Sequence, residues 1–266
     1  MKHQMKLTNQ ELEEAKALGP GIHNFKRKIT LIYNGKKFWK STLDKNTGKI
    51  LLNNVERDTI EVIIILPGVY TIRGSRFHGF NVKTVFMADT VRRIEKYAFY
   101  YCMSLRSVRL SRNLWYIEER AFEGCKSLPS IFIPLSCRNI GDKAFWGCHK
   151  LIIFNVPHQD TRLGSCALTS TALQKASPFS RTPSSQWVKN VNMENEFDLH
   201  RECASMNASE EVIYAIFKER GQKSFQLKNK IGVTASRYLY ENPYTDITEQ
   251  KLIKRFILEH MGEIVN

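Results

Sequence analysis

Residues 117–134 read Ile117-Glu118-Glu119-Arg120-Ala121-Phe122-Glu123-Gly124-Cys125-Lys126-Ser127-Leu128-Pro129-Ser130-Ile131-Phe132-Ile133-Pro134, and the same pattern of apolar positions returns every 23 residues on either side. Four columns repeat: an isoleucine, an Ala-Phe pair, a cysteine and a Leu-x-x-Val-x-Leu segment. Their members are Ile94, Ile117 and Ile140; Ala98-Phe99, Ala121-Phe122 and Ala144-Phe145; Cys102, Cys125 and Cys148; and residues 82–87, 105–110, 128–133 and 151–156. A fixed period of this length predicts a solenoid with one coil per repeat.

Neighbouring coils must stack, because one coil cannot bury its apolar side alone. In the Leu-x-x-Val-x-Leu segment we expect a short strand whose Leu, Val and Leu side chains point inward. The return path ends in Ala-Phe-x-x-Cys, and its Ala and Phe fill the interior of the coil. An earlier copy, from Ile60 to Phe80, fits at a spacing of 22 residues and lacks the Ala and Cys positions, as a terminal repeat often does.

The repeated cysteines are expected to pack in the core and not to form disulfides or bind a metal. Cysteines on adjacent coils would lie roughly 5 Å apart, the spacing of neighbouring strands, which is wider than a relaxed disulfide prefers between Cβ atoms. No Cys-x-x-Cys pair or fourth ligand accompanies them, so we expect no metal site. Cys102, Cys125 and Cys148 are therefore expected to form a buried ladder of small hydrophobic side chains.

The unit at residues 117–134 resembles the BspA-type leucine-rich repeat family, whose pattern is roughly Ile-x-x-x-Ala-Phe-x-x-Cys-x-x-Leu-x-x-Val-x-Leu-Pro. The resemblance covers about residues 60–157. It implies a right-handed solenoid with a parallel sheet along one side. It also implies a protein-binding role, because members of the family are regarded mainly as protein-binding modules.

The whole chain is expected to be an α+β protein in four parts. Residues 1–59 would form an N-terminal cap, residues 60–157 a solenoid of about four to five coils, residues 158–196 an irregular connector, and residues 197–266 a helical region. A cap is needed because the end of a solenoid exposes an unpaired strand edge and apolar core.

Two local signals describe the cap. Thr8-Asn9-Gln10-Glu11 is a capping box, which predicts a helix over about residues 9–18. Ile29 to Tyr33, followed by Asn34-Gly35 and then Lys36 to Ser41, predicts a hairpin with a tight turn. Further along, a short helix is expected between Leu168 and Ala176.

Residues 197–260 change to helical periodicity. Leu199-His200, the Glu211-Val212-Ile213 segment and the Gly232-Val233-Thr234 turn are similar to the ankyrin repeat, with at most two copies. The resemblance implies stacked helix–turn–helix units. The side chains expected to be buried there are Leu199, Val212, Ile216, Leu239, Ile253 and Ile257. The last segment, Asp246 to Met261, is amphipathic and is expected to be a terminal capping helix.

The outward face of the repeated strands is the candidate site for a protein partner. Alternation along the strand places Ile64, Phe86, Arg109, Phe132 and Asn155 in one outward column. Aromatic residues and Arg are favoured at interface hot spots, and extended apolar patches mark contact surfaces. The alternative interpretation is that another segment of the same chain covers this face, which would make the column part of the core.

Charge suggests a second class of partner. The formal net charge is +14, and +13 of it lies before residue 158. A basic region of this kind attracts nucleic acid or another polyanion. Binding of that kind is the alternative function, and a basic surface without any dedicated ligand is the simpler reading of the charge.

No pattern points to an enzyme. The chain has no Gly-rich phosphate loop, no His-Glu-x-x-His and no Gly-x-Ser-x-Gly, so we expect neither catalytic residues nor a cofactor or metal. His200 and Cys203 lie three residues apart on an expected helix, where packing is the more common role. The N-terminus shows no signal peptide and the longest apolar run is too short to span a membrane, so we expect an intracellular protein with reduced cysteines.

Overall fold

The computed structural model describes residues 8–36, 41–43, 50–53, 55–155, 161–176, 203, 208–229, 232–247 and 249–264. The chain divides into two compact units, Met1–Val188 and Lys189–Asn266. The first unit contains the solenoid and its N-terminal cap, and the second is helical. Within the described helices, none combines the length and the apolar character that a membrane span requires.

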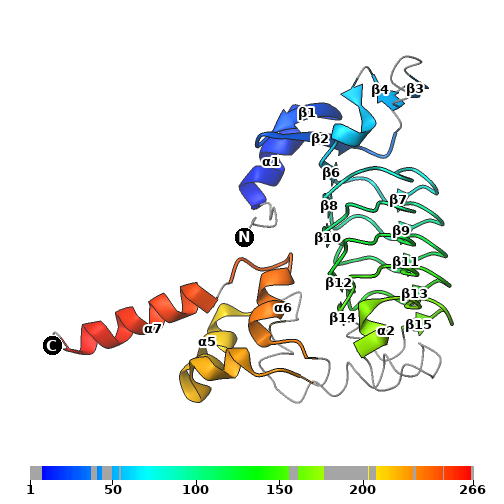
Figure 1. The fold of residues 1–266 in the computed structure, drawn as a ribbon. Helices are drawn as coiled ribbons and strands as arrows, with labels where there is room; N and C mark the ends of the chain where they lie inside the picture. The colour runs from blue at the N-terminus through cyan, green and yellow to red at the C-terminus, as the bar shows by residue number, and fades with distance from the viewer. Residues whose placement is uncertain are drawn as a thin grey trace. The chain divides into compact units, whose positions relative to one another are not determined.

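The solenoid has one strand from each coil on each of two sides (Figure 1). The strands of the repeated Leu-x-x-Val-x-Leu segment, here called the repeat strands, are β6 (Val62–Ile65), β8 (Thr84–Met87), β10 (Ser107–Arg109), β12 (Ser130–Phe132) and β14 (Ile153–Asn155). The return strands are β7 (Thr71–Ile72), β9 (Arg93–Ile94), β11 (Tyr116–Ile117), β13 (Asn139–Ile140) and β15 (Arg162–Leu163). All pairs between coils are parallel and in the expected register. The predicted solenoid is confirmed.

The ladder of repeat strands is interrupted between β10 and β12, which belong to separate sheets. At the position before the strand, the backbone N–H of Arg106 donates to Lys83 and that of Ile152 donates to Pro129, with N···O distances of 2.8 and 3.0 Å. Pro129 occupies the same position in the intervening coil and has no N–H to donate. The interruption therefore coincides with the loss of one bond of the series.

A stack of phenylalanine rings runs through the interior of the coils. The rings of Phe77, Phe99, Phe122 and Phe145 lie face to face, with successive centroids 5.3, 5.1 and 5.3 Å apart. The N–H of each of these residues donates to the carbonyl of the alanine in the next coil, at 2.8 to 2.9 Å. The Ala-Phe column thus combines ring packing with a backbone hydrogen bond between coils.

The cysteine ladder follows the rings. Cys102, Cys125 and Cys148 are fully buried. Each thiol donates to the carbonyl of the phenylalanine in the preceding coil, at 3.1, 3.3 and 3.2 Å. The predicted buried ladder is therefore confirmed, and the weak S–H donor of each cysteine has a partner inside the core.

The N-terminal cap lies on the first coil. Helix α1 (Asn9–Leu18) begins at the capping box of Thr8 and Glu11, as predicted. Strands β1 (Gly21–Phe25) and β2 (Lys28–Tyr33) form an antiparallel hairpin, and β2 also pairs in parallel with β6. The cap therefore extends the sheet of repeat strands and covers its first edge (Figure 1).

The hairpin predicted between residues 29–33 and 36–41 is wrong. The actual turn is at Lys26 and Arg27, which adopt positive φ angles of 52° and 61° although neither is glycine. A strand has only two edges, and those of β2 are occupied by β1 and β6. Residues 41–43 form β3 (Ser41–Leu43) and pair instead with β4 (Ile50–Leu52), which also pairs with β5 (Val55–Glu56); the 3-10 helix η1 (Arg57–Thr59) follows. Residues 37–40 lie outside the described part.

A further coil follows the boundary expected at residue 157. Strand β15 pairs with β13, and Ala167 occupies the position of the repeated alanine. The irregular connector expected from residue 158 is therefore corrected for residues 161–176, where Leu168 and Thr171 replace the repeated phenylalanine and cysteine and are buried as they are. The coil ends in the short helix α2 (Ala172–Ala176), inside the range predicted for a helix.

The second unit is helical. It contains α5 (Glu210–Arg220), the 3-10 helix η2 (Gln222–Gln226), α6 (Ala235–Glu241) and α7 (Glu249–Ile264). Ser209 and Thr234 cap α5 and α6. Leu239 is buried as expected, but Val212 is 47 % exposed and Ile213 is buried in its place. The apolar face of α5 consists of Ile213, Tyr214 and Phe217, so the prediction for Val212 was out of phase by one residue.

Replacing Phe122 with alanine should destabilise the solenoid strongly. The ring is fully buried and stacked on both sides, so its removal leaves a cavity and should cost about 3–5 kcal/mol of unfolding free energy. Urea unfolding followed by circular dichroism measures this loss. Met103→Ala is the matched control, because Met103 is 49 % exposed and its truncation should change stability by about 0.5 kcal/mol or less. Equal effects of the two substitutions would contradict the ring stack.

Candidate functional site

The predicted outward column exists, but the chain itself covers its first part. Ile64 pairs with Phe86 and Phe86 with Arg109 in the register of the repeat strands. Ile64 is 1 % exposed and Phe86 is 3 % exposed. Both belong to a cluster completed by residues of the cap, namely Ala15, Phe25, Ile32 and Val62, with Leu12 and Leu66 at its edge. Ile64 and Phe86 are therefore core residues, because the N-terminal cap of the same chain covers them. This is the alternative interpretation of the outward face given above.

A pocket of about 230 Å³ remains between α1 and the repeat strands. Its lining residues are Leu12, Glu13 and Lys16 from α1; Ile64, Ile65, Leu66 and Pro67 from β6 and its end; Phe86, Met87, Ala88 and Asp89 from β8 and its end; and Arg109 and Arg112 from the third coil. Three of the five predicted residues, Ile64, Phe86 and Arg109, thus contribute to one pocket. Its floor is apolar and its rim carries three cationic and two anionic side chains.

Arg109 is held at the rim by Asp89. One terminal nitrogen of Arg109 donates to the carbonyl of Met87 at 2.6 Å, and both terminal nitrogens reach the Asp89 carboxylate at 3.3 Å. Asp89 also accepts the backbone N–H of Arg112 at 2.9 Å. Burial alone would raise the pKa of Asp89, but the N–H of Arg112 and the positive charge of Arg109 outweigh it and lower this pKa. The rim therefore has a fixed charge pattern at neutral pH.

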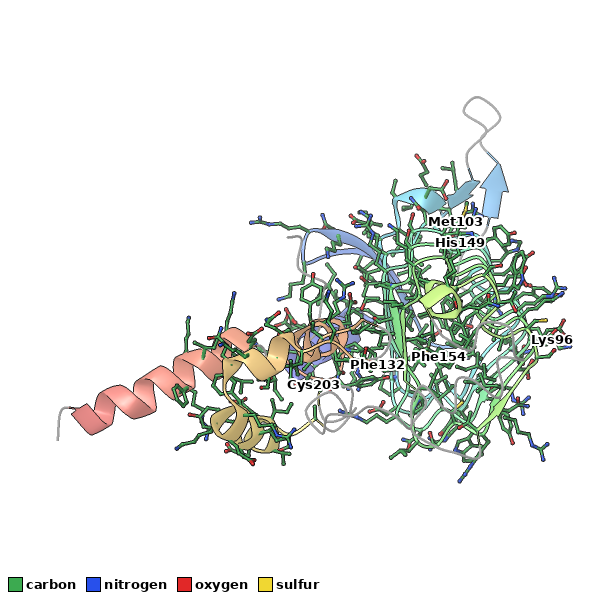
Figure 2. All side chains as sticks on the ribbon, turned by 60° about the horizontal axis from the view of Figure 1, so that its bottom comes forward. Lys96, Met103, Phe132, His149, Phe154 and Cys203 are labelled. Carbon is green, nitrogen blue, oxygen red and sulfur yellow. The ribbon has the colours of Figure 1, made fainter. Side chains whose placement is uncertain are left out.

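The other two predicted residues lie farther along the column. Phe132 pairs with Asn155 in the sheet of β12 and β14, which is separate from the ladder of β10. Phe132 is 1 % exposed, and the side chain of Asn155 lies outside the described residues. Phe132 lies on the side of the coils that the repeat strands form, and Lys96 lies on the opposite side (Figure 2). The structure does not bring Phe132 into the pocket.

Sequence reasoning missed the contribution of α1. The capping box predicted the helix, and the spacing of Leu12, Ala15 and Lys16 gave it an apolar side with a charged edge. Nothing in that pattern says which surface the helix covers. The useful signal was the need of the first coil for a cover, combined with an outward column that is apolar only at Ile64 and Phe86 before Arg109.

The remaining candidate groups are buried or lie outside the described part. Cys203 is fully buried and its carbonyl accepts the side-chain amide of Asn242 at 3.1 Å, whereas its suggested partner His200 is outside the described residues. Burial raises the pKa of the Cys102 and Cys137 thiols to about 12. Among the described residues, no three His, Cys, Asp or Glu side chains gather so that they could hold a metal ion.

The repeat region is similar to a known protein family. A family model described as a BspA type leucine rich repeat region matches residues 56–181 in six copies. Over residues 56–181 the chain is therefore similar to BspA-type leucine-rich repeat regions. The match extends beyond the boundary expected from the repeat columns and includes the coil of β15. No curated protein matches the chain at significant similarity.

Several solved leucine-rich repeat proteins are similar to part of this chain. The T. pallidum leucine-rich repeat protein is 24 % identical over 51 % of this chain and 66 % of its own, with a TM-score of 0.42. A leucine-rich repeat protein from Bacteroides ovatus is 22 % identical, covering 51 % and 39 %, with a TM-score of 0.38. A leucine-rich cell surface protein from Faecalibacterium prausnitzii is 28 % identical, covering 51 % and 36 %, with a TM-score of 0.39. The chain thus spans less than two thirds of each of these proteins.

Asp89→Asn should weaken the leucine-rich repeat region at neutral pH. The lowered pKa of Asp89 means that its stabilising effect is present above the ordinary pKa of about 4 and is lost as pH falls through the folded-state value. We expect a loss of about 1 kcal/mol at pH 7, below the range for buried charged hydrogen bonds because the side chain is 36 % exposed. Urea unfolding at pH 7 and at pH 3 measures the difference, which should be smaller at the lower pH.

The matched control is Asp58→Asn, because Asp58 is 54 % exposed and pairs with its neighbour Arg57. This substitution should change the unfolding free energy by about 0.5 kcal/mol or less. A loss at Asp89 that is equally large at pH 7 and pH 3, or one no larger than that at Asp58, would show that the bonds to Arg109 and Arg112 do not stabilise the fold.

The thiols of Cys102 and Cys137 should resist alkylation in the folded protein. Alkylating reagents attack the thiolate, and a pKa of about 12 keeps both groups protonated at pH 8.5. Unfolding restores the ordinary pKa near 8.5, so stability should fall as pH rises from about 9 towards 12. Iodoacetamide labelling read by mass spectrometry, in buffer and in urea, measures the contrast. Rapid labelling of Cys102 in buffer would show that its coil is open.

Proposed function

We propose that the chain is a non-enzymatic protein-interaction module and that the pocket between α1 and the repeat strands receives a side chain of the partner. The observation that supports this most directly is the convergence of Ile64, Phe86 and Arg109 on one pocket in a leucine-rich repeat region. Repeat proteins present extended surfaces to their partners, and the family is known mainly for such roles.

The chemistry of the pocket favours an apolar anchor. Leu12, Leu66 and Phe86 supply an apolar floor, and the ion pairs of the rim surround it. Buried anchors surrounded by polar groups that exclude water are typical of interface hot spots. The volume of about 230 Å³ is below the roughly 300–1,000 Å³ of small-molecule sites, which favours a side chain over a cofactor.

The pocket differs from the interface that the column suggested. Phe86 contributes one wall and cannot insert into a partner, because only 3 % of it is exposed. Arg109 presents only 14 % of its side chain and is paired with Asp89. The partner must therefore bring the protruding group, and the module supplies the receptor. Binding by Phe132 and Asn155 stays a prediction.

Three further expectations also stay predictions. Nucleic-acid binding by the basic residues would weaken steeply between about 50 and 200 mM salt, whereas an apolar contact would change little. An intracellular location agrees with the six cysteines, none of which forms a disulfide in the structure. The ankyrin-like arrangement of residues 197–266 is the third of these predictions.

Ala88→Trp should weaken binding at the pocket without unfolding the coil. Ala88 lines the pocket and is half-buried at the end of β8, so an indole there would occupy the space meant for the partner. Random peptides selected by display on the wild-type chain should bind the variant at least about tenfold more weakly, which corresponds to the loss of one anchor contact. Fluorescence anisotropy measures both affinities.

Ser127→Trp is the matched control, because Ser127 lies outside the pocket, in the turn before β12. It adds the same indole and should leave binding within about twofold of wild type. Selection of no peptide at all, or of peptides that bind the Ala88 variant as tightly as wild type, would count against the pocket as the partner site.

A further inference from the structure

The return strands carry a second surface made of arginine and aromatic side chains. In the register of these strands, Arg93 pairs with Thr71 and Tyr116, and the residues just before them form an adjacent column. We name the return-strand surface by six residues of the two columns: Tyr70, Arg92, Arg93, Trp115, Tyr116 and Arg138. Tyr70 is 63 % exposed and Trp115 is 48 % exposed, which is unusual for such large rings. The return strands lie on a different side of each coil from the repeat strands (Figure 1).

Two arginines of this surface lie over its aromatic rings. The guanidinium carbon of Arg92 lies 5.4 Å from the centre of the Trp115 ring, and that of Arg93 lies 4.6 Å from the centre of Tyr116. Stacking uses the face of a guanidinium and leaves its N–H edge available for a planar anion. Arg92 gives one N–H to the carbonyl of Asn113 at 2.9 Å, out of the five that the side chain has. The rings therefore orient the arginines before any ligand arrives.

The charge of the surface is one-sided. Neither column contains an acidic residue between Tyr70 and Arg162. Arg93 pairs with Glu118 at 2.6 Å, and the adjacent column holds Arg92 and Arg138. Trp, Tyr and Arg are the residue types that dominate protein interfaces. The complement of this surface is a protein segment that carries carboxylates.

The spacing of the coils limits the form of that segment. Neighbouring strands lie about 4.8 Å apart, so Arg92 and Arg138, two coils apart, are separated by about 9.6 Å along the solenoid. A polyproline II segment advances about 3.1 Å per residue with three residues per turn, so residues i and i+3 share a face about 9.3 Å apart. In a β-strand, residues i and i+3 point to opposite faces. Aromatic side chains are the usual platform for polyproline II segments.

We propose that the return-strand surface binds an acidic polyproline II segment of a protein partner, with carboxylates three residues apart paired to Arg92 and Arg138 and the residues between them packed on Trp115. This site is independent of the pocket beside α1. It gives the basic charge of the solenoid a defined ligand.

Single-stranded nucleic acid is the competing ligand, and the ring geometry disfavours it. Base stacking needs an open ring face. Here one face of Trp115 and one face of Tyr116 are already occupied by guanidinium groups. Carboxylates, by contrast, use the N–H edges that the stacking leaves accessible.

The test compares three fluorescein-labelled probes with the full chain at 150 mM salt. They are the peptide (Glu-Pro-Pro)5, the control peptide (Glu-Pro)5-(Pro)5, which has the same composition but no two Glu residues three apart, and the oligonucleotide (dT)15. We expect the spaced peptide to bind about tenfold more tightly than the control peptide, because only the spaced one places two carboxylates three residues apart on one face. The double variant Arg92→Gln/Arg138→Gln should weaken the spaced peptide about tenfold, as expected for two partly exposed pairs.

Controls separate this site from general charge and from the pocket. The double variant Lys126→Gln/Lys150→Gln removes the same charge from exposed residues elsewhere on the coils and should leave binding within about twofold of wild type. Trp115→Ser changes an exposed side chain, which keeps the fold intact, and should weaken the spaced peptide. Ala88→Trp, which fills the pocket, should not affect it.

Several outcomes would overturn the proposal. Equal affinity for the spaced peptide and the control peptide would show that the surface attracts negative charge without recognising its spacing. Equal losses in the two double variants would do the same. Tighter binding of (dT)15 than of the spaced peptide, lost in Trp115→Ser, would assign the surface to nucleic acid instead.

Discussion

The stacking of each coil on the next is the contact on which the rest of the first unit depends. At the Ala-Phe column, one residue supplies both a ring packed between two others and an N–H that bonds to the following coil. Because each coil touches only its neighbours, stability accumulates from one interface to the next. The thiols of Cys102, Cys125 and Cys148 add a weak hydrogen bond between coils at the same level. The positions of the pocket and of the return-strand surface follow from this stacking.

How far the sequence predicts the structure depends on whether a signal repeats. Positions such as Ile117, Ala121 and Cys125 could be placed because each has equivalents 23 residues away, so that the whole column supports every member. The capping box at Thr8 also succeeded, since its two hydrogen bonds are local. The hairpin of β1 and β2 was missed because its turn uses Lys26 and Arg27 in left-handed conformations that usually indicate Gly or Asn. The Asn34-Gly35 pair was a stronger sequence signal at a place where β2 had no free edge.

The candidate site shows the same limit. Alternation along a strand determines which side of the sheet a residue faces, but not what covers that side. Ile64, Phe86 and Arg109 were placed correctly in one column, yet their burial depends on α1, which is distant in the chain from β8 and β10. The error at Val212 has a related cause, since a helix with apolar residues at adjacent positions can turn either one towards its core. In both cases a tertiary contact decides between two locally equivalent arrangements.

The fixed separation between coils also governs how a surface on this scaffold can change. Side chains on one column are related by whole strand spacings, so the distance between two arginines can grow only in increments of about 4.8 Å. Gain or loss of a 23-residue unit between Arg92 and Arg138 would shift their register on a ligand by one increment, while the cap beside β6 kept its own geometry. A chain with one unit more or less would therefore match a peptide whose charged residues lie one increment farther apart or closer together. The pocket at the first coils would stay the same.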